Sequence, residues 1–372
     1  METKPSSKYK QIADSLMAEI RDGKYASRSV PSENQLVRRF GVGRQTIQNA
    51  FALLAERGLI RRRQGLGTFL TAAARHLTGR IALIIHGSGY CEIFAPISRS
   101  ISHFCQTKGL SLLFSDTACE DNRQRVVQVI RSVRECIKAG IDGVIFQPIE
   151  LMRNSEKINR EITGLFSAAG IPVVLLDSDI VRQPERSGYD IAAVNHFAAG
   201  MKLAGHLRDV GAKRIAYLLQ KNRAPCVQDR HLGLRTGCDG LALAGTGFFA
   251  EPDDTTAIRR MIRTLRPDAI ACYNDRQAVL LMRTLSTLGL SVPRDVMVAG
   301  FDDVNYATLA TPCLTTMHQP CEELAALAFD MLMTRIANPE VPARETFLDA
   351  RLVVRDSTRR KRGVSARATT GK

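Results

Sequence analysis

Apolar positions recur at helical spacing in three short segments at the start of the chain. In residues 7–22 they lie three or four positions apart. A second segment begins at Ser32, with Gln35 three residues later as in a capping box. A third, RQTIQNAFALLAERG (44–58), keeps its apolar residues on one face and ends in glycine. The turn GVG (41–43) joins the last two segments, so the pattern predicts a helix-turn-helix.

The next segment, LIRRRQGLGTFL (59–70), has apolar ends around a basic, glycine-containing centre. A phosphate-binding loop would need a helix after its glycines, usually with a trailing lysine and a serine or threonine. Here the strand-like residues TFL follow and that lysine is missing, so the pattern predicts a β-hairpin wing. Arg61, Arg62 and Arg63 would neutralise DNA phosphates or enter the minor groove. A solvated, charged hairpin on a protein–protein module is the alternative.

From residue 80 onward, apolar runs typical of buried strands alternate with helical patterns such as 122–138 and 197–210. This alternation predicts parallel sheets flanked by helices, arranged as two open α/β lobes. In such sheets ligands bind beyond the carboxyl ends of the strands. The strand runs are RIALII (80–85), LSLLF (110–114), DGVIF (142–146), PVVLLD (172–177), RIAYLL (214–219), AIACY (269–273) and VMVAGF (296–301).

Polar side chains collect at the ends of these predicted strands, and Arg230 follows one of them after a loop. Carboxylates, an amide and a guanidinium in one cleft suit a polyhydroxylated ligand, because each hydroxyl both donates and accepts a hydrogen bond. The alternative for any single aspartate is a helix N-cap or a turn, and Asp275 and Asp303 are assigned to it. The residues are Asp177, Asp179, Asn274, Asp275, Asp302 and Asp303.

The net charge of +15 is unevenly distributed along the 372 residues. Residues 1–75 contain 14 lysines and arginines against 6 acidic residues, whereas residues 359–372 contain 6 basic residues and no acidic one. The part between them is nearly neutral. A basic head and tail on a neutral body are typical of a protein in which one module contacts nucleic acid. For the tail, a disordered, solvated end is the simpler interpretation.

The cysteines and histidines do not form a recognisable reactive or metal-binding pattern. The nine cysteines form no C-x-x-C pair, and the histidines lie at neither zinc-ligand nor catalytic-triad spacing. We therefore expect reduced thiols in the cytoplasm, no metal, no cofactor and no enzymatic activity. The first residues have no apolar signal core and no run approaches 18 apolar residues, which predicts neither secretion nor a membrane span.

The head resembles the winged helix-turn-helix of the GntR family over VPSENQLVRRFGVGRQTIQNAFALLAERGLIRRRQGLGTFL (30–70). The resemblance implies DNA contacts from Arg44 and Thr46 in the recognition helix and from Gln64 and Gly65 at the wing tip. Polar residues near the start of such a helix face base edges in the major groove, and here they also include Gln45, Gln48 and Asn49. Asn34 and Gln48 depart from arginines found in other members, so the operator sequence cannot be transferred.

The body, residues 80–358, resembles the LacI/GalR-type effector domain, a relative of periplasmic sugar-binding proteins. The resemblance is strongest from PDAIACYNDRQAV to FDMLMTRI (267–336) and in RLVVRDST. It implies ligand contacts from Asp177 in the first lobe and from Arg230, Asn274 and Asp302 in the second. Phe94 would flank the ligand or pack in the core. The LacI-type head and hinge helix are replaced by the GntR-type head, an arrangement known from arabinose-responsive regulators.

Two further departures concern the body: Asn195 stands where aspartate is common, and the glycines of LRTGCDGLALAGTGFF (234–249) predict a loop.

The expected fold is a small winged helix-turn-helix (1–71), a linker (72–79), a two-lobed periplasmic-binding-protein-like α/β domain (80–358) and a basic tail (359–372). The expected function is a cytoplasmic, dimeric transcription regulator, a repressor, that binds operator DNA and is controlled by a small-molecule effector, expected to be a sugar. A sugar-binding protein, as in solute transport, or an α/β enzyme without operator function is the alternative.

Overall fold

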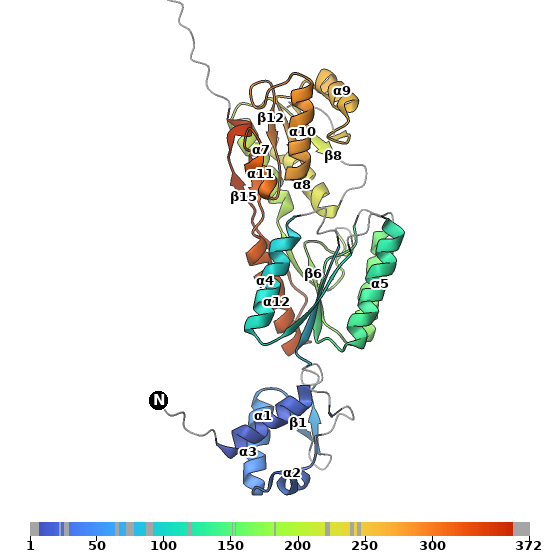
Figure 1. Ribbon diagram of the computed structural model, residues 1–372, viewed down its shortest axis with the longest axis vertical. Helices are drawn as coiled ribbons and strands as arrows, with labels where there is room; N and C mark the ends of the chain where they lie inside the picture. The colour runs from blue at the N-terminus through green and yellow to red at the C-terminus, as the bar shows by residue number, and fades with distance from the viewer. Residues whose placement is uncertain are drawn as a thin grey trace, which may run out of the picture.

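The computed structural model shows a helical head and two α/β lobes, and the C-terminal part of the chain returns to the first lobe (Figure 1). It describes residues 7–21, 24–25, 30–63, 67–71, 78–86, 92–117, 121–150, 152, 154–181, 184–219, 224–238, 242–243 and 247–359. Within these residues, no helix is both long enough and apolar enough to cross a membrane.

The head has the predicted three helices and hairpin. Ser32 accepts a hydrogen bond from the backbone of Gln35, whose side chain accepts one from the backbone of Ser32, so the capping box is confirmed. Gly41 ends the second helix in the left-handed conformation (φ 61°), which glycine adopts without strain. The elements are α1 (Lys8–Arg21), α2 (Glu33–Phe40), α3 (Arg44–Glu56) and the antiparallel strands β1 (Ile60–Arg63) and β2 (Gly67–Leu70).

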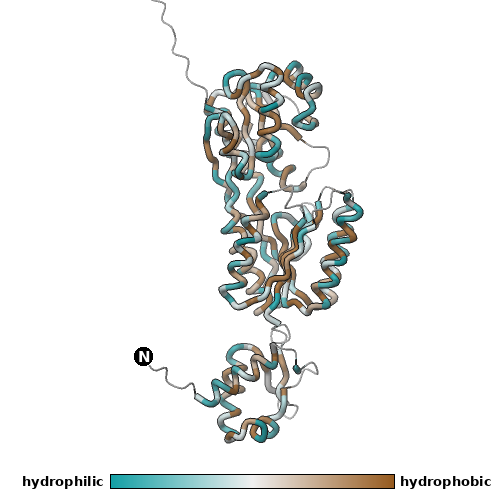
Figure 2. Tube along the Cα trace, viewed as in Figure 1, coloured by the Kyte–Doolittle hydropathy of each residue, from teal (hydrophilic) through white to brown (hydrophobic). Residues whose placement is uncertain are grey.

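The first lobe is a parallel sheet covered by helices on both faces. Its central strands are buried on both sides, which explains their continuous apolar runs. The strand order is β14 (Glu345–Leu348), β7 (Asp190–Val194), β6 (Val173–Leu176), β5 (Gly143–Phe146), β3 (Arg80–Ile85) and β4 (Ser111–Asp116). One face packs on α4 (Phe94–Thr107) and α12 (Cys321–Ala337), the other on α5 (Asn122–Lys138) and α6 (Ser155–Ala168). Figure 2 shows apolar residues along the strands and polar ones on the outer helices.

The second lobe repeats this plan with a smaller parallel sheet. Its order is β10 (Phe248–Phe249), β8 (Arg214–Leu219), β11 (Ala269–Cys272) and β12 (Met297–Ala299), with β9 (Ala242–Leu243) also beside β8. The helices are α7 (His196–Asp209), α8 (Pro225–Gly237), α9 (Thr255–Leu265), α10 (Asp275–Thr287) and α11 (Asn305–Leu309). β13 (Thr316–His318) pairs with β15 (Arg351–Val353), and the short helix η2 (Asp356–Thr358) follows.

The chain passes between the lobes three times, at residues 195, 319–320 and 349–350. The prediction of two α/β lobes with parallel sheets is therefore confirmed. Such crossings allow one lobe to move relative to the other, because only short connections join them.

The loop predicted after Arg230 is wrong at its start. Residues up to Gly237 belong to α8, and Arg230 itself lies within this helix. Glycine serves packing here: a Cβ at Gly237 would lie 2.8 Å from the Cβ of Ala204 in α7, and a Cβ at Gly233, one turn earlier, 2.0 Å from the carbonyl oxygen of Phe197. The contact between α7 and α8 overrides the low helix propensity of glycine.

Alanine at Gly200 or Gly233 should force α7 and α8 apart, because the added Cβ would lie 2.2 Å from the Arg230 carbonyl oxygen or 2.0 Å from that of Phe197. We expect each variant to lose about 1–3 kcal/mol of unfolding free energy, measured by urea denaturation. Gly205→Ala is the control on α7, because its Cβ would come no closer than 3.9 Å to the atoms around it. Equal destabilisation by all three would contradict the close helix contact.

Candidate functional site

The ends of the strands in the two lobes carry the side chains that form the candidate cleft. Asp177 follows β6 in the first lobe, and Asp302 follows β12 in the second. Both are at least nine-tenths buried, and both have a positive φ, 72° and 111°. Such a backbone is unfavourable for residues other than glycine and concentrates at functional sites, which supports this location for the site.

Arg230 is the buried cation of the second lobe, with 5% of its surface exposed. Its Nε donates to Nδ1 of His196 (3.1 Å) and its Nη1 to the carbonyl oxygen of Tyr273 (2.7 Å). The guanidinium lies 3.7 Å from the ring centre of Phe301 and 3.7 Å from Oδ1 of Asp302. A buried charge needs such partners, and together they hold the guanidinium in one orientation.

His196 connects Arg230 to Asp177. Arginine Nε always donates, so Nδ1 of His196 must accept and its proton must sit on Nε2. Nε2 then donates to Oδ1 of Asp177 over 3.0 Å. Burial lowers the pKa of His196, and the positive charge of Arg230 acts in the same direction, which keeps the ring neutral. The ring thus links a carboxylate of one lobe to a guanidinium of the other.

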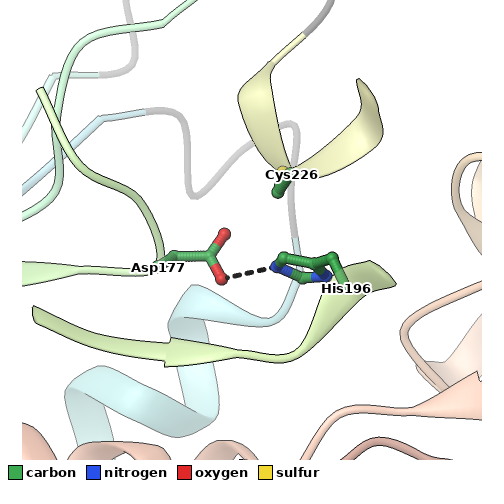
Figure 3. Close-up of side chains that lie close together, drawn as sticks. All are labelled: Asp177, His196 and Cys226. Atoms are coloured by element: carbon green, nitrogen blue, oxygen red, sulfur yellow. Dashed lines mark hydrogen bonds and ion pairs between the residues drawn. The ribbon is translucent and has the colours of Figure 1, made fainter. Parts of the chain in front are cut away.

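The thiol of Cys226 completes a group of potential metal ligands with Asp177 and His196 (Figure 3). Their ligand atoms lie within 4.8 Å of one another. Sequence spacing alone did not indicate this group. Both ring nitrogens of His196 are engaged, and a cation bound there would meet the guanidinium of Arg230. The arrangement therefore favours a hydrogen-bonded cluster over a metal site.

Asn274 and Phe94 have local structural roles. The side chain of Asn274 accepts from the backbone of Gln277 and caps α10. Phe94 is 3% exposed and packs against the apolar residues of the first lobe, which is the core alternative that the sequence left open. Ligand contacts by both residues stay predictions.

The remaining aspartates act within the protein. Asp179 accepts from the backbones of residues 180, 181 and 187, which is a turn. Asp275 accepts from the backbone of Val304 and the hydroxyl of Thr316. Asp303 pairs with Arg355. The expectation of a structural role for Asp275 and Asp303 fits these contacts, but the residue that caps α10 is Asn274 and not Asp275.

The structure adds two polar side chains that sequence reasoning missed. Nε2 of Gln319 donates to Oδ1 of Asp302 over 2.7 Å, and Gln319 is 1% exposed. Glu150 accepts from the hydroxyl of Ser178, the neighbour of Asp177. Burial raises the pKa of Glu150 to about 8, with a further contribution from the charge of Asp177. Both residues follow strand ends, a signal that could have been applied to FQPIE (146–150) and MHQP (317–320).

The recognition helix α3 presents its polar residues outward. Arg44 and Gln45 are exposed, whereas Ile47 is buried against the core of the head. Nε of Arg44 and Nε2 of Gln48 donate to the same oxygen of Glu33 on α2, at 2.8 and 3.3 Å. This carboxylate orients both side chains on the face predicted to contact DNA.

Thr46 is partly exposed on the same turn of α3. Arg61, Arg62 and Arg63 form β1, opposite β2, as the wing predicts. Gln64 and Gly65 lie outside the described residues. DNA contacts by all these residues stay predictions.

Comparison with known proteins agrees with this division. Residues 8–70 match the bacterial regulatory proteins of the gntR family, and residues 204–358 match the periplasmic binding protein-like domain. The chain is 26% identical to the arabinose metabolism transcriptional repressor of Geobacillus stearothermophilus, over 96% of this chain and all of that one. It is 28% identical to the ribose operon repressor of Escherichia coli K12, over 77% of this chain and 86% of that one.

Among solved structures, a LacI family transcriptional regulator from Enterococcus faecium with bound ribose has a similar fold. Its TM-score is 0.59 at 21% identity, and the match covers 75% of this chain and 98% of that one. The fold, the site and the relatives define a DNA-binding transcriptional regulator. More particularly, this regulator joins a GntR-type winged helix-turn-helix head to a periplasmic-binding-protein-like effector domain.

His86, which follows β3 at the cleft end of the first sheet, should make the fold sensitive to acid. Burial lowers its pKa to about 4. As the pH falls, the His86 ring of the unfolded chain is protonated at about pH 6.5, whereas the buried ring of the folded chain stays neutral. The free energy of unfolding is therefore at its full value above pH 6.5 and decreases toward pH 4. The loss should reach about 3 kcal/mol, measured by urea denaturation across this range.

His86→Leu should flatten this part of the pH profile relative to the wild type. His103→Leu, at an exposed position of α4, is the control and should leave the profile unchanged. Parallel profiles for the wild type and His86→Leu would show that the buried ring is not responsible.

Proposed function

We propose that this regulator is a cytoplasmic repressor that binds operator DNA as a homodimer and responds to a sugar between its two lobes. The proposed boundaries are 1–71 for the head, 72–79 for the linker, 80–358 for the effector domain and 359–372 for the tail. The main support for this proposal is the mixed set of buried hydrogen-bond donors and acceptors around Arg230, Asp177 and Asp302.

The chemistry of this set supports a sugar. The carboxylates of Asp177 and Asp302 accept hydrogen bonds, the guanidinium of Arg230 donates them, and the amide of Gln319 can do both. A sugar hydroxyl needs both kinds of partner at once. The names of the relatives, arabinose and ribose repressors, and the ribose-bound structure of similar fold point to the same ligand class.

Ligand binding must favour one lobe arrangement over another to produce a signal. The three crossings let the lobes close around a ligand, and closure in a dimer would change the distance or angle between the two heads. A coupling of about 1–3 kcal/mol would change operator affinity about 5- to 150-fold. Two heads also require operators with two-fold symmetry.

The direct test is to capture fragmented genomic DNA with the purified protein at near-physiological salt and to sequence the bound fragments, with and without a panel of monosaccharides. Salt is fixed because it controls non-specific binding. Enrichment of a few two-fold-symmetric sites, lost or gained with one sugar, is expected. Binding without sequence preference in every condition would contradict operator function. Steady conversion of a sugar by the protein would favour an enzyme instead.

Arg44→Ala should weaken binding to the captured operator by about 1–3 kcal/mol and relax its sequence preference, because a side chain facing a base edge is lost. Fluorescence anisotropy with the operator and with base-substituted versions would measure both effects. Arg294→Ala, at an exposed arginine of the second lobe, is the control and should bind like the wild type. Unchanged preference in Arg44→Ala would place the recognition surface elsewhere.

Asp302→Asn should weaken sugar binding and leave operator binding without sugar intact. A hydrogen bond to a charged group contributes about 1.5–3 kcal/mol, so calorimetry should show roughly 10- to 150-fold weaker binding. Asp209→Asn, at an exposed position on α7, controls for the loss of a carboxylate. Loss of operator binding in Asp302→Asn would make the residue structural.

A further inference from the structure

The imidazole of His196 contacts a ligand-facing group of each lobe. It accepts from Nε of Arg230 at 3.1 Å and donates to Oδ1 of Asp177 at 3.0 Å, and its side chain is buried. We propose that His196 is a positioning residue that holds these two groups, and through them the two lobes, at a set separation. This inference rests on the proposed function of the cleft and gives His196 the role of setting the lobe arrangement that a ligand meets.

Both ends of this His196 bridge (Asp177–His196–Arg230) are anchored in their own lobes. The backbone N–H of Asp177 donates to the carbonyl oxygen of Ala192 in the first sheet. The guanidinium of Arg230 is held by Phe301 and the carbonyl of Tyr273 in the second lobe. A shift of one lobe against the other must therefore break a hydrogen bond of the ring and leave a buried polar group unsatisfied, which is unfavourable.

The position of the bridge couples it to ligand binding. In the described part of the chain, the backbone passes between the lobes at residues 195, 319–320 and 349–350, and His196 directly follows the first of these crossings. Among the described residues, Nη2 of Arg230 has no protein hydrogen bond, so it can donate to a ligand that enters beside the bridge. A ligand that contacts Arg230 and Asp177 thus finds them at the separation that the bridge sets.

Two substitutions of His196 separate its hydrogen bonding from its packing. Glutamine carries an acceptor oxygen and a donor nitrogen on one planar group and can replace both hydrogen bonds in part. Leucine fills similar volume but makes neither bond. A packing role would be served by leucine at least as well as by glutamine, whereas the bridge requires the polar group.

The experiment uses the ligand-free full-length chain and hydrogen exchange read by mass spectrometry on peptides spanning the three crossings. His196→Leu should speed exchange there about fivefold or more, and His196→Gln should stay within about twofold of the wild type. Equal exchange in the wild type and both variants would overturn the proposal, and so would leucine behaving like glutamine.

A second measurement needs no variant. In the wild type labelled with ¹⁵N-histidine, NMR should show that the ring whose signals are absent from His196→Gln is neutral, with its proton on Nε2 and Nδ1 unprotonated. A proton on Nδ1 of His196 would overturn the proposal. Neither measurement involves DNA or sugar, so failure of the bridge and failure of the sugar-responsive function are observed separately.

Discussion

The burial of one guanidinium organises the whole effector cleft. Arg230 loses almost all contact with water, so its charge must be balanced by an aromatic face, a backbone carbonyl, a nearby carboxylate and the ring of His196. These partners come from three segments, since Phe301 and Asp302 follow β12, Tyr273 follows β11 and His196 begins α7. The cleft is therefore pre-organised, which reduces the ordering that a ligand must impose when it binds.

The charge of the cleft and that of the head serve opposite purposes. The head carries an excess of positive charge and an outward polar face on α3, suited to a long polyanion that any basic surface attracts. The cleft instead holds few buried charges, with Arg230 beside Asp302 and a neutral His196 that donates to Asp177. Such a site selects by hydrogen-bond direction and shape rather than by attraction, which fits the proposed recognition of an uncharged sugar.

Local rules account for the parts of the fold that were predicted correctly. The capping box at Ser32 and the glycine turn at Gly41 depend on contacts within a few residues, so the helices of the head follow from sequence alone. Buried runs such as VVLL in β6 predict parallel strands because both faces are covered. The loop predicted over residues 234–249 was wrong at its start because a neighbouring helix, α7, packs closely on the glycines of α8.

The sequence by itself placed Asp177 and Asp302 at strand ends and Arg230 after a strand, and the resemblance to the effector domain made them ligand candidates together with Asn274. Only the tertiary structure decided that Phe94 packs inward, and that His196 and Gln319 complete the site. The physical reason is range. Strand and helix patterns repeat every few residues. His196 contacts Asp177 and Arg230, which are 19 and 34 positions away in the sequence, because the fold brings the end of β6, the start of α7 and helix α8 together.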